Sequence, residues 1–467
     1  MGSVRQKAMQ GWKPDITGTL GPKYLAIAEA IARDVEAGML NAGDRLPPQR
    51  MLAEALGVDL TTITRAYGEA QRLGLIEGDG RRGSFVRGKS EPAGILYKEP
   101  ADAGMNAPPE APDRLLEKAF AASVAQLLGR SDGPAPFHYQ PRGGMALARE
   151  AGAALLRGRG IPAQEDMVLV SAGGQHALHA VISTELQPGD VLAVGAFVYP
   201  GLLSVARRYG LKLRAVPSDA EGMLPDALAM ACAEGAVAVY LVPTNDNPTT
   251  ATMGQSRRAA LAAVIREHGI KLIEDDAYGM LPERPLAPIA ALVPERSWHI
   301  ASVSKILSPG LRVAWVAAPD VAAAWRLAAD LHETAVMAPP LNVAVVADWL
   351  HGSTFDTLCT ATRAEARARQ AIARSVLRAD SFHAQEEGYH LWMPLPDGAN
   401  ATEIVYALRP QGLSVVAGDA FAVEPASAPP ALRISIGGST PRDRLERALR
   451  LLDALTTPDV TRKIALV

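Results

Sequence analysis

Apolar positions at helical spacing predict three short helices near the start of the chain. The first covers residues 24–37, where apolar residues recur every four positions. The second begins at the prolines 47 and 48 and ends at Gly57, and the third runs from about Leu60 to Leu73. Two helices joined by a tight turn form the motif that places its second helix in a DNA groove.

A β-hairpin is predicted after these helices, with strands at 75–77 and 84–86 around a glycine-rich tip that carries Arg81 and Arg82. Such a hairpin would form a wing beside the helix-turn-helix. Its glycines also match dinucleotide-binding and phosphate-loop patterns, but both patterns require a helix directly after the glycines. A strand and then a proline-containing stretch follow instead, so we reject both nucleotide-binding interpretations.

The rest of the chain alternates short apolar runs with longer, alanine-rich helical stretches. The runs include 167–170, 191–194, 237–242 and 271–273. Strands separated by helices indicate an α/β domain with a mostly parallel sheet. Before it, residues 89–112 are rich in proline and lack apolar periodicity, as in a linker. We therefore expect a winged helix-turn-helix (α+β) domain over 15–88, this linker, and the α/β domain over 113–467.

Composition narrows the class of protein. The chain has 467 residues, of which 48% are hydrophobic, which is ample for two globular domains. Residues 1–90 hold 13 Lys and Arg against 10 Asp and Glu, so the small excess of positive charge is at the DNA-binding end. Cys232 and Cys359 are far apart, and His176 and His179 have no further ligand nearby, so neither a disulfide nor a metal site is expected. No targeting or membrane segment is apparent, so we expect a cytoplasmic protein without a membrane contact.

The most informative chemistry lies at residues 302–312, where Lys305 is accompanied by Ser302, Ser304 and Arg312. A single lysine is most often a solvated surface residue. Here, however, the amine could form an imine with an aldehyde while the hydroxyls and the guanidinium bind a phosphate dianion. This combination suggests the cofactor pyridoxal 5′-phosphate (PLP).

The first domain resembles the GntR family of bacterial regulators, through residues 46–50 (LPPQR), 61–67 (TTITRAY) and 83–86 (GSFV). The resemblance implies contacts with double-stranded DNA from a set of exposed residues. These are Arg50, Thr61, Thr62, Thr64, Arg65, Arg81, Arg82 and Gly83. The chain departs from the family at Asp59-Leu60, where relatives usually carry Ser or Asn followed by Arg, so one base- or phosphate-reading arginine is missing there.

Residues from about 113 onward resemble the fold-type I aminotransferases, and the order of the two domains resembles the MocR subfamily of transcription regulators. The resemblance implies that Lys305 is the Schiff-base lysine of PLP. It also implies that Asp275 pairs with the protonated pyridine nitrogen and that Tyr278 and Asn247 bond the ring's phenolic oxygen. A carboxylate at the ring nitrogen keeps the ring cationic, which lets it draw electrons from the imine.

The same resemblance implies further contacts with the cofactor. Tyr199 would stack on the pyridine ring. A phosphate cradle is expected from Gly173, Gly174, Gln175, Ser302, Ser304 and Arg312, since 171–175 lie between a strand and a helix. Tyr139 would reach the phosphate bound by the partner subunit of a homodimer.

Arg433 resembles the arginine that clamps the α-carboxylate of an amino acid, which in a regulator would be the effector. One departure affects the loop that carries Asn247, because Thr250 replaces the glycine of the aminotransferase pattern. We expect this change to affect loop geometry more than cofactor binding.

Three functions are consistent with these residues. The complete DNA-binding domain favours a PLP-dependent transcription regulator, in which an amine or amino acid displaces Lys305 from the imine. A metabolic aminotransferase with an accessory DNA-binding module is the alternative, and in a variant of the first interpretation PLP itself is the signal. Every group needed to hold the cofactor and a carboxylate is retained, so slow residual transaminase activity is compatible with a regulatory protein that is not a physiological enzyme.

Overall fold

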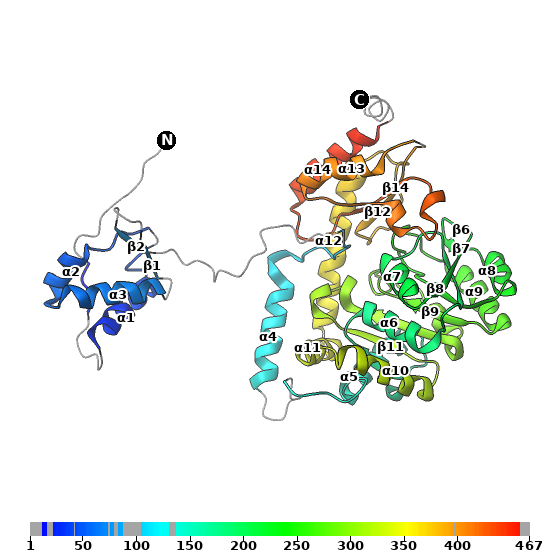
Figure 1. Cartoon of the computed structure of the whole chain (residues 1–467), viewed down its shortest axis with the longest axis horizontal. Coiled ribbons are helices and arrows are strands. Elements are labelled where there is room, and N and C mark those ends of the chain that lie inside the picture. The colour runs from blue at the N-terminus through cyan, green and yellow to red at the C-terminus, as the bar shows by residue number, and fades with distance from the viewer. Residues whose placement is uncertain are drawn as a thin grey trace. The chain divides into compact units, whose positions relative to one another are not determined.

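The computed structural model describes residues 12–15, 22–41, 43–72, 75–78, 83–86, 104–129, 137–396 and 398–457 (Figure 1). The chain divides into two compact units, Met1–Ala101 and Asp102–Val467. Among the described residues, no helix is both long and apolar enough to cross a membrane.

The first unit contains the three predicted helices and the hairpin. They are α1 (Lys23–Glu36), α2 (Gln49–Leu56), α3 (Leu60–Arg72), β1 (Ile76–Gly78) and β2 (Ser84–Val86). Gly57 ends α2 in the left-handed conformation (φ 61°), which glycine adopts without a steric cost. The core is formed by apolar residues from all three helices and the hairpin, including Ile31, Leu52, Ile63 and Val86. This packing confirms the predicted winged helix-turn-helix.

The second unit is built on a seven-stranded sheet with the order β3-β11-β10-β9-β8-β4-β5. The strands are β3 (Val168–Ser171), β4 (Val191–Gly195), β5 (Lys212–Val216), β8 (Ala236–Leu241), β9 (Lys271–Asp275), β10 (Ser297–Ser302) and β11 (Ala314–Ala317). Only β11 runs against its neighbours in this sheet, so the prediction of a mostly parallel sheet is confirmed. A short hairpin, β6 (Ser218–Asp219) with β7 (Gly222–Met223), follows β5.

Alternate residues of the interior strand β8 belong to two separate hydrophobic cores. Ala238 and Tyr240 lie in one core and Val239 and Leu241 in the other. Because successive side chains of a strand point to opposite faces, the two cores lie on the two faces of the sheet. Helices α6 (Gly174–Glu185) and α7 (Pro200–Arg208) contribute to the first core, and α8 (Pro225–Ala233) and α9 (Gln255–His268) to the second.

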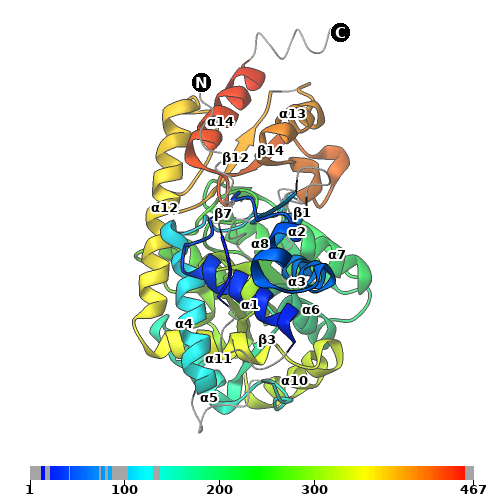
Figure 2. The same ribbon diagram turned by 90° about the vertical axis from the view of Figure 1, so that its left-hand side faces the viewer.

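A three-stranded antiparallel sheet completes the unit, in the order β12 (His390–Pro394), β14 (Ala431–Ser435), β13 (Ser414–Ala417). The helices not yet named are α4 (Leu115–Gly129), α5 (Ala146–Gly158), α10 (Val321–Ala335), α11 (Pro340–His351), α12 (Thr354–Val376), α13 (Ala401–Leu408) and α14 (Arg442–Thr456). The long helix α12 runs beside α4 and connects the region of the large sheet with that of the small one (Figures 1 and 2).

The predicted chemistry gathers at one edge of the large sheet. Strands β3, β4, β8, β9 and β10 are parallel, so their carboxyl ends share an edge, which is where ligands bind in open α/β sheets. Asp275 ends β9 and Ser302 ends β10, while Gly173 follows β3 and Tyr199 follows β4. Residues 104–111, expected in the linker, pack into this unit, and Asn106 is buried.

Candidate functional site

Lys305 lies directly after β10, at the end of a short 3-10 helix (Val303–Lys305). Burial lowers the pKa of its amine to about 8, and the positive charges of Arg433 and Arg312 act in the same direction. A lowered pKa increases the fraction of neutral amine, which is the form that attacks a carbonyl carbon. Nζ donates a hydrogen bond of 2.5 Å to the backbone carbonyl of Asn106.

Asp275 is buried at the end of β9, and its Oδ2 accepts a hydrogen bond of 2.9 Å from the hydroxyl of Tyr240. Burial raises the pKa of Asp275 to about 6, while the Tyr240 hydrogen bond and the charge of Lys305 oppose this shift. A cation next to this carboxyl would stabilise its ionised form. The environment therefore suits a carboxylate that pairs with a protonated ring nitrogen.

Tyr278 is buried, and its hydroxyl accepts a hydrogen bond of 2.9 Å from Nδ2 of Asn106. The same amide nitrogen lies 3.1 Å from Nδ1 of His390, whose Nε2 lies 3.0 Å from the carbonyl of Asp246. An amide nitrogen only donates, so Nδ1 of His390 accepts and its Nε2 carries the proton. Burial lowers the pKa of His390 to about 3, which fits this neutral ring.

The loop that carries Asn247 has Thr250 where the aminotransferase pattern has glycine. Thr250 occupies the left-handed conformation, with φ of 64°. Its backbone nitrogen donates to the carbonyl of Asp246 over 2.7 Å, and its carbonyl accepts from Nε2 of Gln385 over 2.8 Å. The buried Oδ1 of Asn247 has no hydrogen-bond partner among the described residues, so the amide is available to a bound molecule.

The residues expected to bind a phosphate lie between β3 and α6 and beside Arg312. Gly173 has φ of 88°, and a Cβ atom placed there would lie 2.8 Å from Nη2 of Arg312. Arg312 itself donates to the carbonyl of Ala172 over 2.8 Å. Gly174 and Gln175 begin α6, where backbone N–H groups have no partner within the helix and the helix dipole favours an anion.

The two serines of the cradle are held by each other. Oγ of Ser302 donates to Oγ of Ser304 over 2.9 Å and also accepts from the backbone nitrogen of Ser304. Both residues are buried at the carboxyl end of β10, next to Lys305 in the chain. They join the cradle through Gly174, since a Cβ at that glycine would lie 3.5 Å from Cβ of Ser302.

Tyr199 precedes α7 and packs over Gly201, where a Cβ atom would lie 2.3 Å from Cε1 of its ring. Gln175 reaches the same place, with Nε2 donating to the carbonyl of Gly201 over 3.4 Å. Burial raises the pKa of Tyr199, the charge of Asp275 raises it further and that of Arg312 lowers it. The Tyr199 ring thus lies close enough to interact electrostatically with Asp275, expected at the ring nitrogen of the cofactor, and with Arg312, expected at its phosphate.

Arg433 occupies the middle of β14 and is only 1% exposed. Its guanidinium lies 5.5 Å from the centroid of the Phe421 ring and donates from Nη2 to the backbone carbonyl of Gly104. A buried guanidinium is suited to bidentate recognition of a carboxylate. The structure therefore places the expected carboxylate site and Lys305 beneath the same segment of chain.

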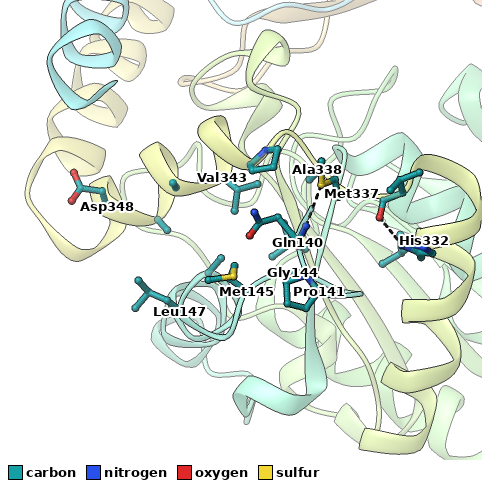
Figure 3. Close-up of a pocket in the computed structure, with 18 of the residues that line it drawn as sticks. Gln140, Pro141, Gly144, Met145, Leu147, His332, Met337, Ala338, Val343 and Asp348 are labelled. Atoms are coloured by element: carbon teal, nitrogen blue, oxygen red, sulfur yellow. Dashed lines mark hydrogen bonds between the residues drawn. The ribbon is translucent and has the colours of Figure 1, made fainter. Parts of the chain in front are cut away.

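Tyr139 lies apart from this group: it is 84% exposed and forms no hydrogen bond with the other predicted residues. The segment that follows it lines an apolar cavity of about 610 Å³, together with the end of α10 and with α11 (Figure 3). Met145, Val343 and Ala338 are among its lining residues, and it contains neither Lys305 nor Arg433.

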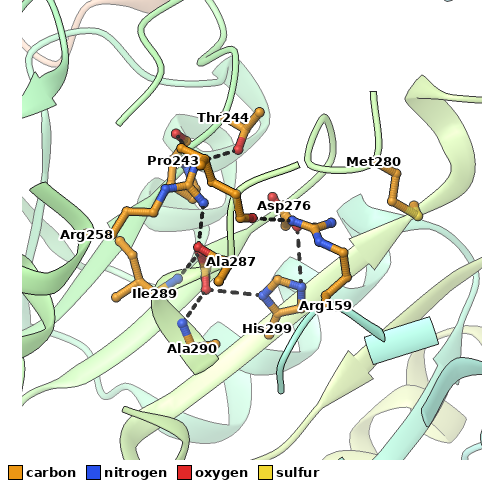
Figure 4. A network of polar contacts seen from close by, with 12 residues as sticks. Arg159, Pro243, Thr244, Arg258, Asp276, Met280, Ala287, Ile289, Ala290 and His299 are labelled. Carbon is orange, nitrogen blue, oxygen red and sulfur yellow. Dashed lines mark hydrogen bonds and ion pairs between the residues drawn. The ribbon is translucent and has the colours of Figure 1, made fainter. Parts of the chain in front are cut away.

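A buried polar network includes Asp276, the residue that follows Asp275 in the chain (Figure 4). Nη1 of Arg159 is 3.1 Å from Oδ2 of Asp276, which is 3.6 Å from Nε2 of His299. Arg258 donates to the carbonyls of Met253, Pro243 and Ala287 and to Oγ1 of Thr244. Arg258 therefore fixes both ends of the stretch from Pro243 to Met253, which includes Asn247.

In the first unit, Arg50, Thr61, Thr64 and Arg65 are exposed and Thr62 is partly exposed. Oγ1 of Thr64 donates to Gln49 over 2.8 Å, so α2 and α3 present a connected surface. Gly83 has φ of 113° and adjoins the side chain of Arg45, a basic residue that the sequence did not single out. Arg81 and Arg82 lie outside the described residues.

Sequence reasoning missed several residues of the second unit's site. Asn106 lay in the expected linker, and no motif marked Tyr240, His390 or Ser435. Together with the predicted residues they form a site with a partly neutral lysine, a buried carboxyl, an anion cradle and a buried guanidinium. The arrangement fits a phosphate-bearing pyridine aldehyde, and the orphaned Asn247 oxygen and the Gly173 cradle are the observations that support this fit.

Comparison with known proteins places both units. The model for aminotransferase class I and II matches residues 104–452, and the model for bacterial regulatory proteins of the gntR family matches residues 23–86. The aminotransferase fold family depends on PLP.

Among curated proteins, the chain is 28% identical to the HTH-type transcriptional regulator YdeF of Bacillus subtilis, over 95% of this chain and 97% of that protein. It is 29% identical to the vitamin B6 salvage pathway transcriptional repressor PtsJ of Salmonella typhimurium, over 85% and 90%. Among solved structures it resembles LysN, the alpha-aminoadipate aminotransferase of Thermus thermophilus, complexed with N-(5′-phosphopyridoxyl)-L-leucine. That match has a TM-score of 0.67 and 26% identity, and covers 78% of this chain and 92% of LysN.

Proposed function

Because the chain belongs to the aminotransferase class I and II family and joins it to a GntR-type DNA-binding unit, as MocR regulators do, we propose that it is a PLP-dependent transcription regulator. Lys305 would hold the cofactor through its aldehyde carbon, and an amine or amino acid effector that enters the site would take the place of Lys305 there. This exchange alters the binding of DNA by a homodimer, in the cytoplasm.

The observation that carries the proposal is the presence of both halves in one chain: an exposed helix-turn-helix surface and a complete set of cofactor groups. Lys305 would hold the cofactor covalently and Asp275 its ring nitrogen. Tyr278 and Asn247 would hold the phenolic oxygen, with Tyr199 against the ring. Arg433 would take the carboxylate of the effector.

The phosphate would be held by the cradle at the start of α6. Its members are Gly173, Gly174, Gln175, Ser302, Ser304 and Arg312. When bound, PLP supplies an electrophilic carbon and an electron-withdrawing ring. The chain's own residues would orient the effector, and burial together with Arg433 lowers the pKa of the Lys305 amine that the effector would displace.

A homodimer is supported by large apolar side chains that are exposed near the cavity of Figure 3. Phe137 is 78% exposed and Tyr139 84%, and Leu128, Leu147 and Val336 are exposed as well. Exposed apolar patches of this kind mark interfaces between proteins. In the dimer that we propose, Tyr139 reaches the phosphate bound by the partner.

The first unit would read paired half-sites on DNA through Arg50, Thr61, Thr62, Thr64, Arg65 and Gly83, with Arg81 and Arg82, which lie outside the described residues, as further contacts. Leu60 is 41% exposed at the start of α3, in the place where relatives usually carry arginine. Base recognition at this point would therefore depend on apolar contact and not on a charged side chain.

The proposal is tested by adding PLP to the full-length protein and recording its visible absorption, then reducing with borohydride and measuring the intact mass. We expect a visible band and one added cofactor mass at Lys305, and neither in Lys305→Ala. Operator DNA selected with the wild-type protein is then bound with and without a panel of amino acids, polyamines and taurine-like amines. A protein that binds no DNA, or that gains no cofactor mass, would refute the proposal.

An aminotransferase with an accessory DNA-binding module is the alternative, and the likeness to LysN favours it. Steady turnover of an amino acid with a keto acid, at rates unaffected by DNA, would support that alternative. A third possibility, PLP itself as the signal, is favoured by the likeness to PtsJ. It requires DNA affinity to change when PLP alone is added.

A further inference from the structure

The segment Gly104–Pro108, here named the strap, lies across both cationic groups of the site. The carbonyl of Gly104 accepts from Nη2 of Arg433, and the carbonyl of Asn106 accepts from Nζ of Lys305. These are the groups expected to receive the effector's carboxylate and the cofactor's aldehyde. One short piece of backbone therefore contacts both groups that a ligand needs.

The side chain of Asn106 anchors the strap. Its Nδ2 donates to the hydroxyl of Tyr278 and to Nδ1 of His390, and its Oδ1 accepts from Oγ of Ser435 over 2.7 Å. All three partners are buried, so the removal of this amide would leave unsatisfied polar groups in the interior.

The backbone on the other side of Asn106 is held by the turn after β14. The nitrogen of Gly438 lies 3.2 Å from the carbonyls of Ala107 and Pro108. A Cβ atom at Gly437 would lie 2.0 Å from the carbonyl oxygen of Ala107, so the strap packs against a position that only glycine allows. Val416 of β13 approaches Gly104 from the same small sheet. The strap is thus bound to the strand that carries Arg433.

We propose that the strap is an internal competitor of the effector: a carboxylate that binds Arg433 displaces the Gly104 carbonyl and releases the strap. This inference rests on the proposed function and adds its route of regulation. A hydrogen bond between a guanidinium and a carboxylate is roughly twice as strong as one to a neutral carbonyl, so the exchange favours the effector. The effectors selected in this way are primary amines that also carry a carboxylate.

Release of the strap also provides a covalent route to the DNA-binding unit. Residues 87–103 join Val86, the last residue of β2, to Gly104. A ligand shifts an equilibrium only by its different affinity for the two states, and here the difference arises because a carboxylate bound bidentately to Arg433 takes the Nη2 donor from the Gly104 carbonyl. The apparent affinity for the effector is the intrinsic affinity multiplied by the fraction of molecules in which the strap is released, so docking of the strap lowers it.

The test compares two probes on the full-length protein loaded with PLP. L-alanine carries both an amine and a carboxylate, whereas ethylamine carries only the amine. Absorption spectra report the replacement of Lys305, and hydrogen–deuterium exchange reports the backbone amides of residues 104–110. We expect L-alanine to accelerate exchange in this segment, and ethylamine to replace Lys305 without doing so.

Asn106→Ala removes the anchor and should lower the half-saturating concentration of L-alanine by roughly tenfold relative to that of ethylamine. Glu110→Ala, at an exposed residue two positions after the end of the strap, is the matched control and should behave as wild type. Ser435→Ala removes one of the three anchoring hydrogen bonds and should give a smaller shift in the same direction.

If L-alanine displaced the Lys305 amine from the cofactor without faster hydrogen–deuterium exchange at residues 104–110, the strap model would be overturned. The proposed function would remain intact. Equal acceleration of hydrogen–deuterium exchange by L-alanine and ethylamine would also overturn the strap model. So would an Asn106→Ala protein in which ethylamine displaces Lys305 but L-alanine at the same concentrations does not. Absence of any band from Lys305-bound cofactor would instead refute the proposed function.

Discussion

The hydroxyl of Tyr240 donates a hydrogen bond to Oδ2 of Asp275 over 2.9 Å, within a fully buried pair that no sequence motif connects. Burial raises the pKa of Asp275 to about 6, and the hydrogen bond from Tyr240 opposes this rise because it stabilises the ionised carboxylate. The buried hydroxyl of Tyr240 thus helps to keep the Asp275 carboxyl ionised near neutral pH.

We expect the affinity for PLP to fall as the pH falls through about 6, because a protonated Asp275 cannot pair with a cationic ring nitrogen. Tyr240→Phe removes the hydrogen bond that lowers the pKa of Asp275, so its affinity should begin to fall at a higher pH and be about fivefold weaker at pH 6. Titration of PLP between pH 5.5 and 8 measures this. Tyr406→Phe, at an exposed tyrosine, is the control, and identical profiles for all three proteins would contradict the role of Tyr240.

Gly173→Ala should weaken PLP binding by about tenfold and destabilise the fold by about 1 kcal/mol. The added Cβ would lie 2.8 Å from Nη2 of Arg312, in a backbone conformation with φ of 88° that alanine adopts at a cost. Gly189→Ala is the matched control, since φ there is 95° but nothing lies within 4 Å. It should lose similar stability in denaturant unfolding and keep full affinity for PLP, and equal losses of affinity would argue against the cradle.

Asp276→Ala should lower the free energy of unfolding by about 3–5 kcal/mol, because it removes the carboxylate that pairs with the largely buried Arg159 (Figure 4) and leaves that guanidinium only the carbonyl of Leu286. Glu446→Ala removes the partner of Arg450 in an exposed pair and should cost less than about 1 kcal/mol. Chemical denaturation of the three proteins measures both effects. Similar stabilities for the two variants would mean that the network of Figure 4 does not depend on Asp276.

Arg50→Ala should weaken binding to a selected operator severalfold and reduce the slope of log affinity against log salt by about 1, as expected for the loss of one phosphate contact. The cofactor spectrum should not change, because Arg50 belongs to the other unit. Arg409→Ala, an exposed arginine of the larger unit, controls for a simple change of net charge. An unchanged salt slope for Arg50→Ala would remove Arg50 from the DNA-binding surface.

The helices of the first unit, the parallel sheet and the lysine region were predictable because local patterns mark them. Helical periodicity located α1, and the spacing of hydroxyls and arginine around Lys305 indicated its chemistry. Asn106 could not be found in this way, because its contacts reach Lys305 and Ser435 across 199 and 329 residues of chain. A stretch that is rich in proline looks like a linker whether or not its end is buried.

Thr250 is a residue whose conformation depends on tertiary contacts. It stands where the aminotransferase pattern has glycine, and it adopts the left-handed conformation that favours glycine. Hydrogen bonds with Asp246 and Gln385 hold its backbone on both sides, and Arg258 secures the ends of the loop. Tertiary contacts of this kind can offset the conformational cost of a β-branched residue, and no local pattern reports them.

The burial of Asn106 has a practical consequence for anyone who dissects the protein. A fragment cut at residue 113, where the proline-rich stretch ends, would lose Asn106 and leave the buried Tyr278, His390 and Ser435 without the amide that they contact. A cut upstream of Gly104 would keep all three contacts.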